Sequence, residues 1–411
     1  MLKYFNKLDL HIVDFNLALF LRSVLLLTPI TLLFYQENGL TAQHLFFFQG
    51  VFYLTSILSE IPVGYLSDAI SRKFLLFLSC ILYFAAIVFW INFYGYYVIL
   101  LGEIMFAISK VMLDNAMPGY LYDYLSKNNK QNTMVKYYGY LHFYLAFGTA
   151  IASVLGTYLY AKFGSGKLLL TEAFVMIVAA MLVGFLPTIK PTTKNNNLCF
   201  SCKVKEFVLN AKSLYSNNSI KWHIIYSGLL TSISILLSVS FQPLMQNALF
   251  PIFMFGVIAF SNHGIRALAG IVASKWMRNF NIRGLVIPLY LLYILAFLCV
   301  FASIKFANVY LVTLLIILMC LIVGCQLVFT ILHVSRLQEF VEMNNRGNLM
   351  SINNFISRSL AAVMLISSKL FIEKLDIMNY FVIIFVLYLI ICTFIMCKVY
   401  NVKEEIWKSF W

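Results

Sequence analysis

The sequence has few charged residues. Only 11% of its 411 residues are Asp, Glu, Lys or Arg, whereas 62% are hydrophobic. A water-soluble domain needs a larger charged fraction to cover its surface, so this composition excludes a soluble globular protein. The alternation of apolar and polar residues that marks membrane β-strands is also missing. The sequence therefore predicts an all-α membrane protein, with the lipid bilayer as its main surroundings.

Signatures of enzymes and of metal sites are missing as well. The six His residues are dispersed, and neither a His-Glu-x-x-His zinc motif nor a Ser-x-x-Lys pair occurs. No Gly-rich phosphate loop is present, which argues against ATP as an energy source. The one Cys-x-x-Cys, formed by Cys199 and Cys202, has no second pair to complete a zinc site, and we interpret it as two reduced thiols. We expect no catalytic activity, no cofactor and no metal.

Long apolar runs dominate what is present. A helix needs about 20 apolar residues to cross a bilayer, and such runs recur from Phe15 to Tyr400. They predict twelve membrane-spanning helices, near residues 15–35, 43–66, 74–94, 97–120, 137–161, 168–187, 222–242, 248–273, 284–304, 308–331, 349–370 and 377–397. The first run is too long for the core of a signal peptide, so we expect it to remain as a span.

The positive charges lie mainly between these runs. The net charge is +14, but most of the 30 Lys and Arg residues fall in the N-terminus, in alternate loops and in the C-terminal tail. This distribution indicates membrane orientation rather than a nucleic-acid surface, and it predicts that both termini are cytoplasmic. We expect a multi-pass protein of the inner or plasma membrane, as a monomer.

A polar segment divides the predicted helices into two groups of six. It predicts an N-terminal bundle over residues 1–187, a cytoplasmic linker over residues 188–221, and a C-terminal bundle with a short tail over residues 222–411. Gly64–Arg72 and Gly270–Arg278 form a faint repeat, with Gly and Arg at the same spacing. The sequence therefore predicts two pseudo-symmetric bundles.

The first copy of this repeat carries a recognisable motif. Gly64, Leu66, Asp68, Arg72 and Lys73 resemble the signature of the major facilitator superfamily, at the expected place after the second span. The sequence departs from that signature at two positions, with Ala69 in place of a basic residue and Ser71 in place of Gly.

The resemblance implies a gate at the cytoplasmic side. Asp68 would face the start of the eleventh span, and Arg72 would pair with Asp123 at the end of the fourth. A carboxylate stabilises the free N–H groups of a helix start, and an Arg can bond two acids. The alternative is that Arg72 and Lys73 only follow the preference for positive charge on the cytoplasmic side.

Several ionisable residues lie inside predicted spans, where each costs about 2.5–3.5 kcal/mol on insertion scales. Glu103, Lys110 and Asp114 share one helical face, and the resemblance turns the fourth span toward a central cavity. Arg22 is expected at a similar depth. We therefore predict a midplane site of Arg22, Lys110 and Asp114, with Asp114 as the proton carrier. The alternative is a structural Lys110–Asp114 salt bridge.

Other intramembrane polar residues carry weaker expectations. Glu60 and Arg358 are predicted to pair between the two bundles, and Glu172 is expected to lie at the membrane interface. Ser234 and Gln326 are candidate cavity residues, although hydroxyls in membrane helices often bond their own chain instead. Small residues at positions 148, 152 and 156 predict a seam for close helix packing.

Together these features favour a secondary transporter that moves a small organic solute by alternating access, coupled to H⁺. Glu60-Ile61-Pro62 and Leu121-Tyr122-Asp123 resemble one bacterial branch of the superfamily that includes exporters, so export of a metabolite or amphiphilic compound is favoured. Uptake of a nutrient or metabolite, and a non-transporting receptor of transporter fold, are the alternatives.

Overall fold

A computed structural model of the chain describes residues 7–130, 133–189, 200–216, 218–276, 282–306, 309–339 and 346–400. Within these ranges the ordered elements are helical. In the first half of the chain they are α1 (Lys7–Arg22), the short 3₁₀-helix η2 (Thr28–Ile30), α2 (Thr31–Glu37), α3 (Ala42–Ala69), α4 (Arg72–Asn92), α5 (Tyr96–Lys127) and α6 (Met134–Phe185). In the second half they are α7 (Phe200–Ser216), α8 (Asn218–Asn247), α9 (Ile252–Trp276), α10 (Ile282–Lys305), α11 (Val309–Glu339) and α12 (Arg346–Tyr400).

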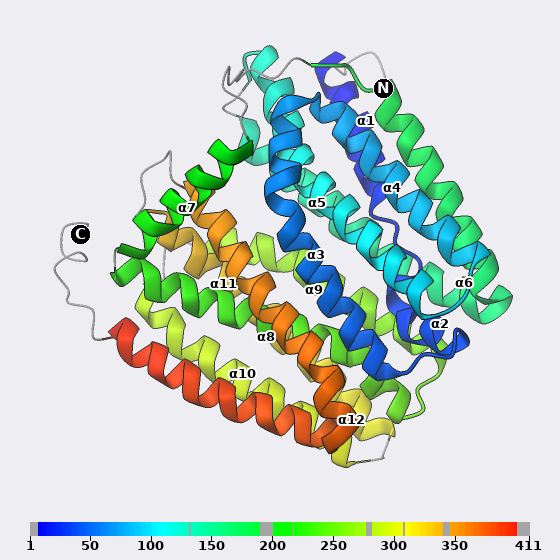
Figure 1. The fold of residues 1–411 in the computed structure, drawn as a ribbon, viewed down its shortest axis with the longest axis vertical. Coiled ribbons are helices and arrows are strands. Elements are labelled where there is room, and N and C mark those ends of the chain that lie inside the picture. Colours follow the sequence, from blue (N-terminus) through cyan, green and yellow to red (C-terminus); the bar gives the residue numbers. More distant parts are fainter. Residues whose placement is uncertain are drawn as a thin grey trace. The chain divides into compact units, whose positions relative to one another are not determined.

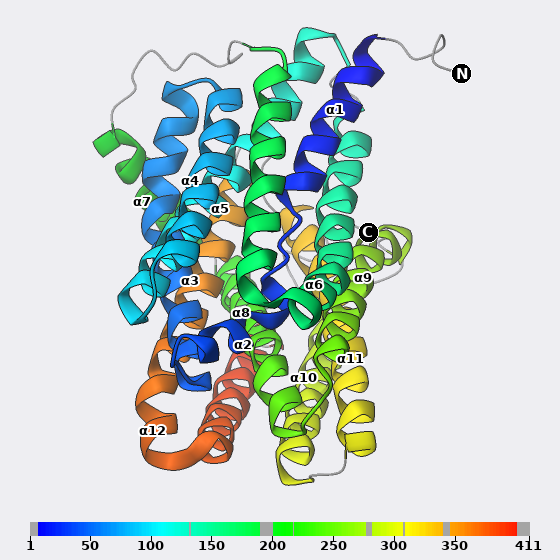
Figure 2. The same cartoon turned by 90° about the vertical axis from the view of Figure 1, so that its right-hand side faces the viewer.

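The helices confirm the predicted all-α membrane class. Of the described residues, eight stretches are long and apolar enough to cross a membrane. Two helices exceed a single crossing, because α6 has 52 residues and α12 has 55, whereas about 20 are enough to span the bilayer. α6 turns at Gly164, whose φ of 78° favours glycine. α12 folds back on itself (Figure 2), and its arms are joined by a hydrogen bond from Tyr380 O–H to Met364 O of 2.5 Å. The total of twelve crossings stays a prediction.

The first predicted span is wrong in one respect, because it is not a continuous helix. α1 ends at Arg22, and the chain runs without regular structure until η2 begins at Thr28 (Figure 2). Pro29 lies in the first turn of η2, where its missing N–H is tolerated. We call residues 23–27 the helix break.

The chain divides into two compact units. Unit 1 comprises Met1–Lys203 with Leu249–Ala267, and unit 2 comprises Val204–Ala248 with Leu268–Trp411. The predicted boundaries at residues 187 and 222 are not tested by this division and stay a prediction.

Unit 1 is organised around α5. α4 and α3 both pack along it, while α6 packs against α1 and α4; Figure 1 shows α4 and α5 side by side. Ser71 caps the start of α4, where its Oγ accepts a hydrogen bond from Phe74 N–H of 3.3 Å. Ser71 therefore replaces the glycine of the superfamily signature with a side chain that stabilises the helix start. These contacts place α5 between α3 and α4, in contact with both.

Unit 2 is organised around α8, which packs against α12 and α11. Tyr226 of α8 donates a hydrogen bond of 2.7 Å to Val286 O of α10. The amphipathic α7 lies on α12 through Phe207, whose ring centroid is 5.7 Å from that of Phe355. Phe207 and Ala211 of α7 thus pack against unit 2, whereas Val208 and Leu209 are exposed.

Candidate functional site

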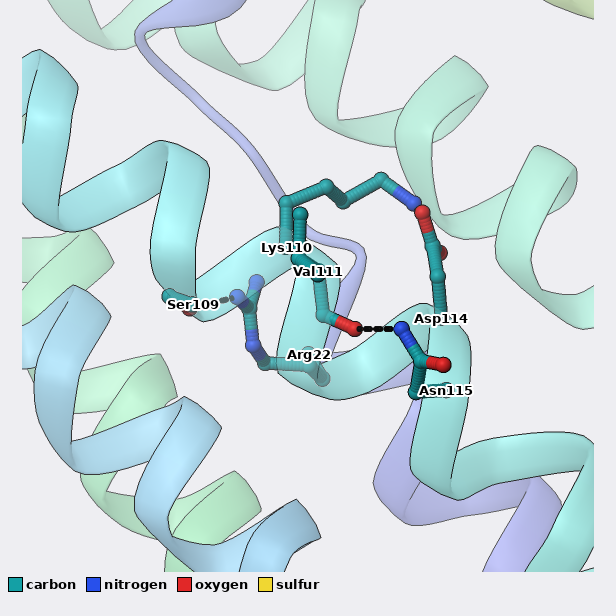
Figure 3. A network of polar contacts seen from close by, with 6 residues as sticks. All are labelled: Arg22, Ser109, Lys110, Val111, Asp114 and Asn115. Carbon is teal, nitrogen blue, oxygen red and sulfur yellow. Dashed lines mark hydrogen bonds and ion pairs between the residues drawn. The ribbon is translucent and has the colours of Figure 1, made fainter. Parts of the chain in front are cut away.

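The polar face of α5 carries an ion pair. Lys110 Nζ contacts Asp114 Oδ1 one helical turn away (Figure 3), as their spacing of four residues predicts. Their side chains are 40% and 32% exposed. The pair is thus formed and still accessible, which is compatible both with a solute site and with a structural salt bridge.

Arg22 has a different partner from the predicted one. It is 2% exposed, and its Nη2 donates a hydrogen bond of 2.5 Å to Ser109 Oγ, which in turn donates to Ser79 O at 2.7 Å. Figure 3 shows Arg22 directed at Ser109, whereas Lys110 turns toward Asp114. The guanidinium also lies over the Tyr83 ring, 4.9 Å from its centroid. These contacts bring Arg22 to α4 and α5, and they do not assemble the predicted three-residue site.

Glu172 lies in the buried interior of unit 1. Its side chain is 0% exposed, so the expectation of an interfacial residue is wrong. Oε2 accepts a hydrogen bond of 3.0 Å from Leu27 N–H at the helix break, and Oε1 accepts one of 2.5 Å from the Tyr83 hydroxyl. A carboxylate here stabilises a backbone N–H that the interrupted helix leaves without an intrahelical partner.

The predicted small-residue seam of α6 packs against the helix break. A Cβ added to Gly156 would lie 2.1 Å from Leu26 O, and one added to Gly148 would lie 2.7 Å from Phe20 O. Between these two positions, Thr149 Oγ1 donates a hydrogen bond of 3.2 Å to Ser23 O. The two glycines therefore leave room for the backbone of the helix break to approach α6 closely. Polar backbone groups of the break can then form hydrogen bonds within the protein.

Glu103 is the second buried acid of unit 1. It is 3% exposed, and its Oε1 accepts a hydrogen bond of 2.5 Å from the hydroxyl of Tyr35 in α2. Its Oε2 is buried and has no hydrogen-bond partner among the residues that the structure describes. Phe48 packs against Tyr35 with ring centroids 5.4 Å apart, so the immediate surroundings are mainly apolar.

Part of the predicted gate is assembled. Arg72 Nη1 lies 2.6 Å from Asp123 Oδ2 and donates a hydrogen bond of 2.8 Å to Gly119 O. Asp123 is 2% exposed. A Cβ on Gly119 would lie 2.6 Å from Arg72 Nε, so Gly119 leaves room for the Arg72 side chain. The side chain of Asp68 lies outside the described residues.

The other predicted site residues are dispersed or untested. Glu60 and Arg358 belong to different units, so their pairing stays a prediction. Ser234 Oγ lies 2.5 Å from the Tyr293 hydroxyl, and Gln326 is 0% exposed, with neither amide atom hydrogen-bonded within the described part of the chain. On α8, the Ser238 hydroxyl donates a hydrogen bond of 2.8 Å to the Ser234 carbonyl. Such a bond within one helix is the alternative to a cavity-lining role. Cys199 lies outside the described residues, as does the side chain of Cys202.

Sequence reasoning missed a histidine pair in unit 2. Nδ1 of His223 and Nε2 of His333 are 2.9 Å apart, and their side chains are 2% and 1% exposed. The two residues are 110 positions apart, so no local spacing could have revealed the contact. Among the described residues, no group of three or more His, Cys, Asp or Glu side chains is arranged to hold a metal ion.

A family model described as Major Facilitator Superfamily matches residues 15–366. No curated protein sequence matches.

Two kinds of solved structure resemble the whole chain. The nucleoside transporter NupG is 13% identical, with a TM-score of 0.76 over 97% of this chain and 100% of that one. A bacterial homologue of the human lysosomal transporter Spinster, in an inward-facing and unoccupied conformation, is also 13% identical, with a TM-score of 0.71 over 99% of both chains. Its inward-facing, occupied form is 12% identical, with a TM-score of 0.73 over 96% of this chain and 97% of that one. At these identities the likeness shows the fold alone.

Proposed function

The chain belongs to the major facilitator superfamily, a family of secondary transporters rather than enzymes, and we propose that it exports a small organic solute by alternating access in exchange for H⁺. The proposal places it in the inner or plasma membrane as a monomer, with both termini in the cytoplasm. It assigns residues 1–187 and 222–411 to the two moving bundles and residues 188–221 to the linker.

The accessible Lys110–Asp114 pair carries the proposal. Both side chains are about a third or more exposed on a helix that is long and apolar enough to cross a membrane. A charged pair that faced lipid would be costly, so this exposure supports a polar, solvent-filled path beside α5. A solute that carries a charged group can exchange partners with either member of the pair. We therefore favour an anionic or zwitterionic solute, which would bind Lys110 through its negative group.

The Arg72–Asp123 contact supports the proposed gate. It fixes the start of α4 to α5 in unit 1, with Gly64, Asp68 and Lys73 on the adjoining segment. In the proposal, Asp68 engages unit 2 in one state of the transport cycle and releases it in the other. Glu60 and Arg358 form a second contact between the bundles, while Ser234 and Gln326 contribute from the C-terminal bundle.

Flux in proteoliposomes tests the function. Purified protein would be reconstituted with a panel of radiolabelled amphiphilic, anionic and zwitterionic solutes under an imposed pH gradient. We expect at least one solute to move against its own gradient, and a protonophore to abolish that movement. Saturable binding without flux for the same solutes would instead establish the receptor alternative. If the solute moves only down its own gradient, at a rate that does not depend on pH, then transport is not coupled to protons.

A further inference from the structure

The buried charges around Tyr83 in unit 1 do not balance. Lys110 pairs with Asp114, and Arg72 pairs with Asp123. In the interior around Tyr83, one cation, Arg22, stands against two acids, Glu103 and Glu172, and all three side chains are at most 3% exposed. An uncompensated charge in such surroundings is costly, so one of the two acids should be neutral.

Glu172 has the surroundings of an ionised carboxylate. It accepts hydrogen bonds from Leu27 N–H and from the Tyr83 hydroxyl, one at each oxygen. Arg22 lies over the ring of the same Tyr83, so the guanidinium and the carboxylate approach one side chain. Hydrogen bonds to a carboxylate and a nearby cation both favour its charged form. Arg22 and Glu172 thus compensate each other.

Glu103 has the surroundings of a neutral acid. It accepts a single hydrogen bond, from Tyr35, and its Oε2 is buried without a partner in the described part of the chain. The side chains near Glu103 come from several helices. Tyr35 of α2 donates to Glu103, and the ring of Phe48 from α3 packs against Tyr35. The rings of Phe52 from α3 and Tyr83 from α4 pack against Phe106, which lies three residues after Glu103 on α5. Arg22 of α1 and Glu172 of α6 both contact Tyr83. Arg22, the one cation in this set, is directed at Ser109 and Tyr83 rather than at Glu103.

We propose that Glu103, and not Asp114, holds the exchangeable proton, bound at Oε2. With that proton in place, the group of Arg22, Glu172 and Glu103 has no net charge. Release breaks the O–H bond of the Glu103 carboxyl and transfers the proton to a water molecule that reaches Oε2, leaving a carboxylate that the Tyr35 hydroxyl still stabilises at Oε1. The coupling role rests on the proposed function, whereas the bound proton does not.

Infrared spectroscopy of the purified full-length protein tests the proton directly. At neutral pH we expect the absorption band of a protonated carboxyl group, displaced by ¹³C-glutamate labelling. Tyr35→Phe and Tyr83→Phe form a matched pair, because each removes one hydroxyl, from Glu103 and from Glu172 respectively. The band should shift in Tyr35→Phe and stay in place in Tyr83→Phe.

Further variants complete the test. Glu103→Gln should abolish the band, and Asp114→Asn should retain it. The proposal is overturned if the wild-type protein has no such band, or if the band responds to Tyr83→Phe and not to Tyr35→Phe. The two tyrosine variants decide the matter even if Glu103→Gln fails to fold. If the Glu103 band is present but solute flux does not depend on the pH gradient, then Glu103 binds a proton that is not coupled to transport.

Discussion

Two acidic side chains on α5 differ in their exposure to solvent. Asp114 is 32% exposed and bonded to Lys110 within one helix, whereas Glu103 is 3% exposed and bonded to another helix. The sequence predicted the Lys110–Asp114 contact, because a spacing of four places the two residues on the same face. It could not rank the two acids, because burial depends on α2 and α4, which approach from elsewhere in the chain.

Substitution of Asp114 is predicted to weaken solute binding and leave proton coupling intact. For a zwitterionic solute, Asp114→Asn removes the carboxylate that would bind the positive group, and a loss of about 1.4 kcal/mol raises the apparent KM about tenfold. The pH dependence of transport should be unchanged, because Glu103 carries the proton. Concentration-dependent flux measured at several pH values checks both parts, with Asn115→Ala as a control on the same turn. If Asp114→Asn still transports the solute but without pH dependence, then Asp114 rather than Glu103 carries the proton.

At the scale of helices, the first span differs most from its prediction. The run from residue 15 to residue 35 is mainly apolar apart from Arg22, so its length indicates a continuous helix. The break arises from partners outside the run, namely Glu172, Thr149 and the two glycines of α6. The small-residue seam was predictable from its spacing, but its partner, an irregular segment rather than a helix, was not.

One methyl group in this seam should destabilise the protein. Gly156→Ala would place a Cβ 2.1 Å from Leu26 O, and the overpacking should lower the free energy of unfolding by about 1–3 kcal/mol. Gly139→Ala is the matched control on α6, because its Cβ would meet nothing within 4 Å. Thermal unfolding in detergent compares the two variants. Equal melting temperatures would mean that the break and the seam are not in the close contact described.

The histidine contact between α8 and α11 predicts a dependence of stability on pH. His333 lies beyond the span Tyr310–Val328, and burial, followed by the neighbouring His223, lowers its pKa well below 6.5. As the pH falls below about 6.5, the unfolded chain binds a proton that the folded chain does not, so stability is lost by up to about 1.4 kcal/mol per pH unit. Above that pH the full stability is present.

Melting temperatures measured between pH 7.5 and pH 5.5 check this dependence. His333→Gln should lose this part of the slope, while His44→Gln, which alters a more exposed ring on α3, should keep it. An identical slope in wild type and His333→Gln would contradict the assignment.

At the scale of the whole molecule, the sequence sufficed to predict the family and one contact of the proposed gate. Asp68, Arg72 and Asp123 are recognisable because a short motif follows the second span at a fixed place, and Arg72 meets Asp123. Residues such as His223 and His333 could not be paired, because nothing in their local sequence ties one to the other. Solute identity is similarly absent, since it depends on the shape of a path lined by several helices.

The gate is predicted to govern transport rather than folding. Asp68→Asn removes a negative charge proposed to stabilise a helix start in unit 2, and we expect transport to fall about tenfold, equivalent to about 1.4 kcal/mol. The amount of protein in the membrane and its melting temperature should be unchanged. Asp68→Glu, which keeps the charge, is the control. Unaltered flux in Asp68→Asn would remove this residue from the proposed gate.

The helix break also bears on the order in which the chain is assembled. As residues 15–35 leave the ribosome, they form one apolar segment that can enter the bilayer as a continuous helix. Glu172 and the glycines of α6 are synthesised later, so the contacts that support the break do not yet exist. The first crossing therefore reaches its final form only after α6 has been inserted, and its maturation belongs to the closing steps of biogenesis for this half of the chain.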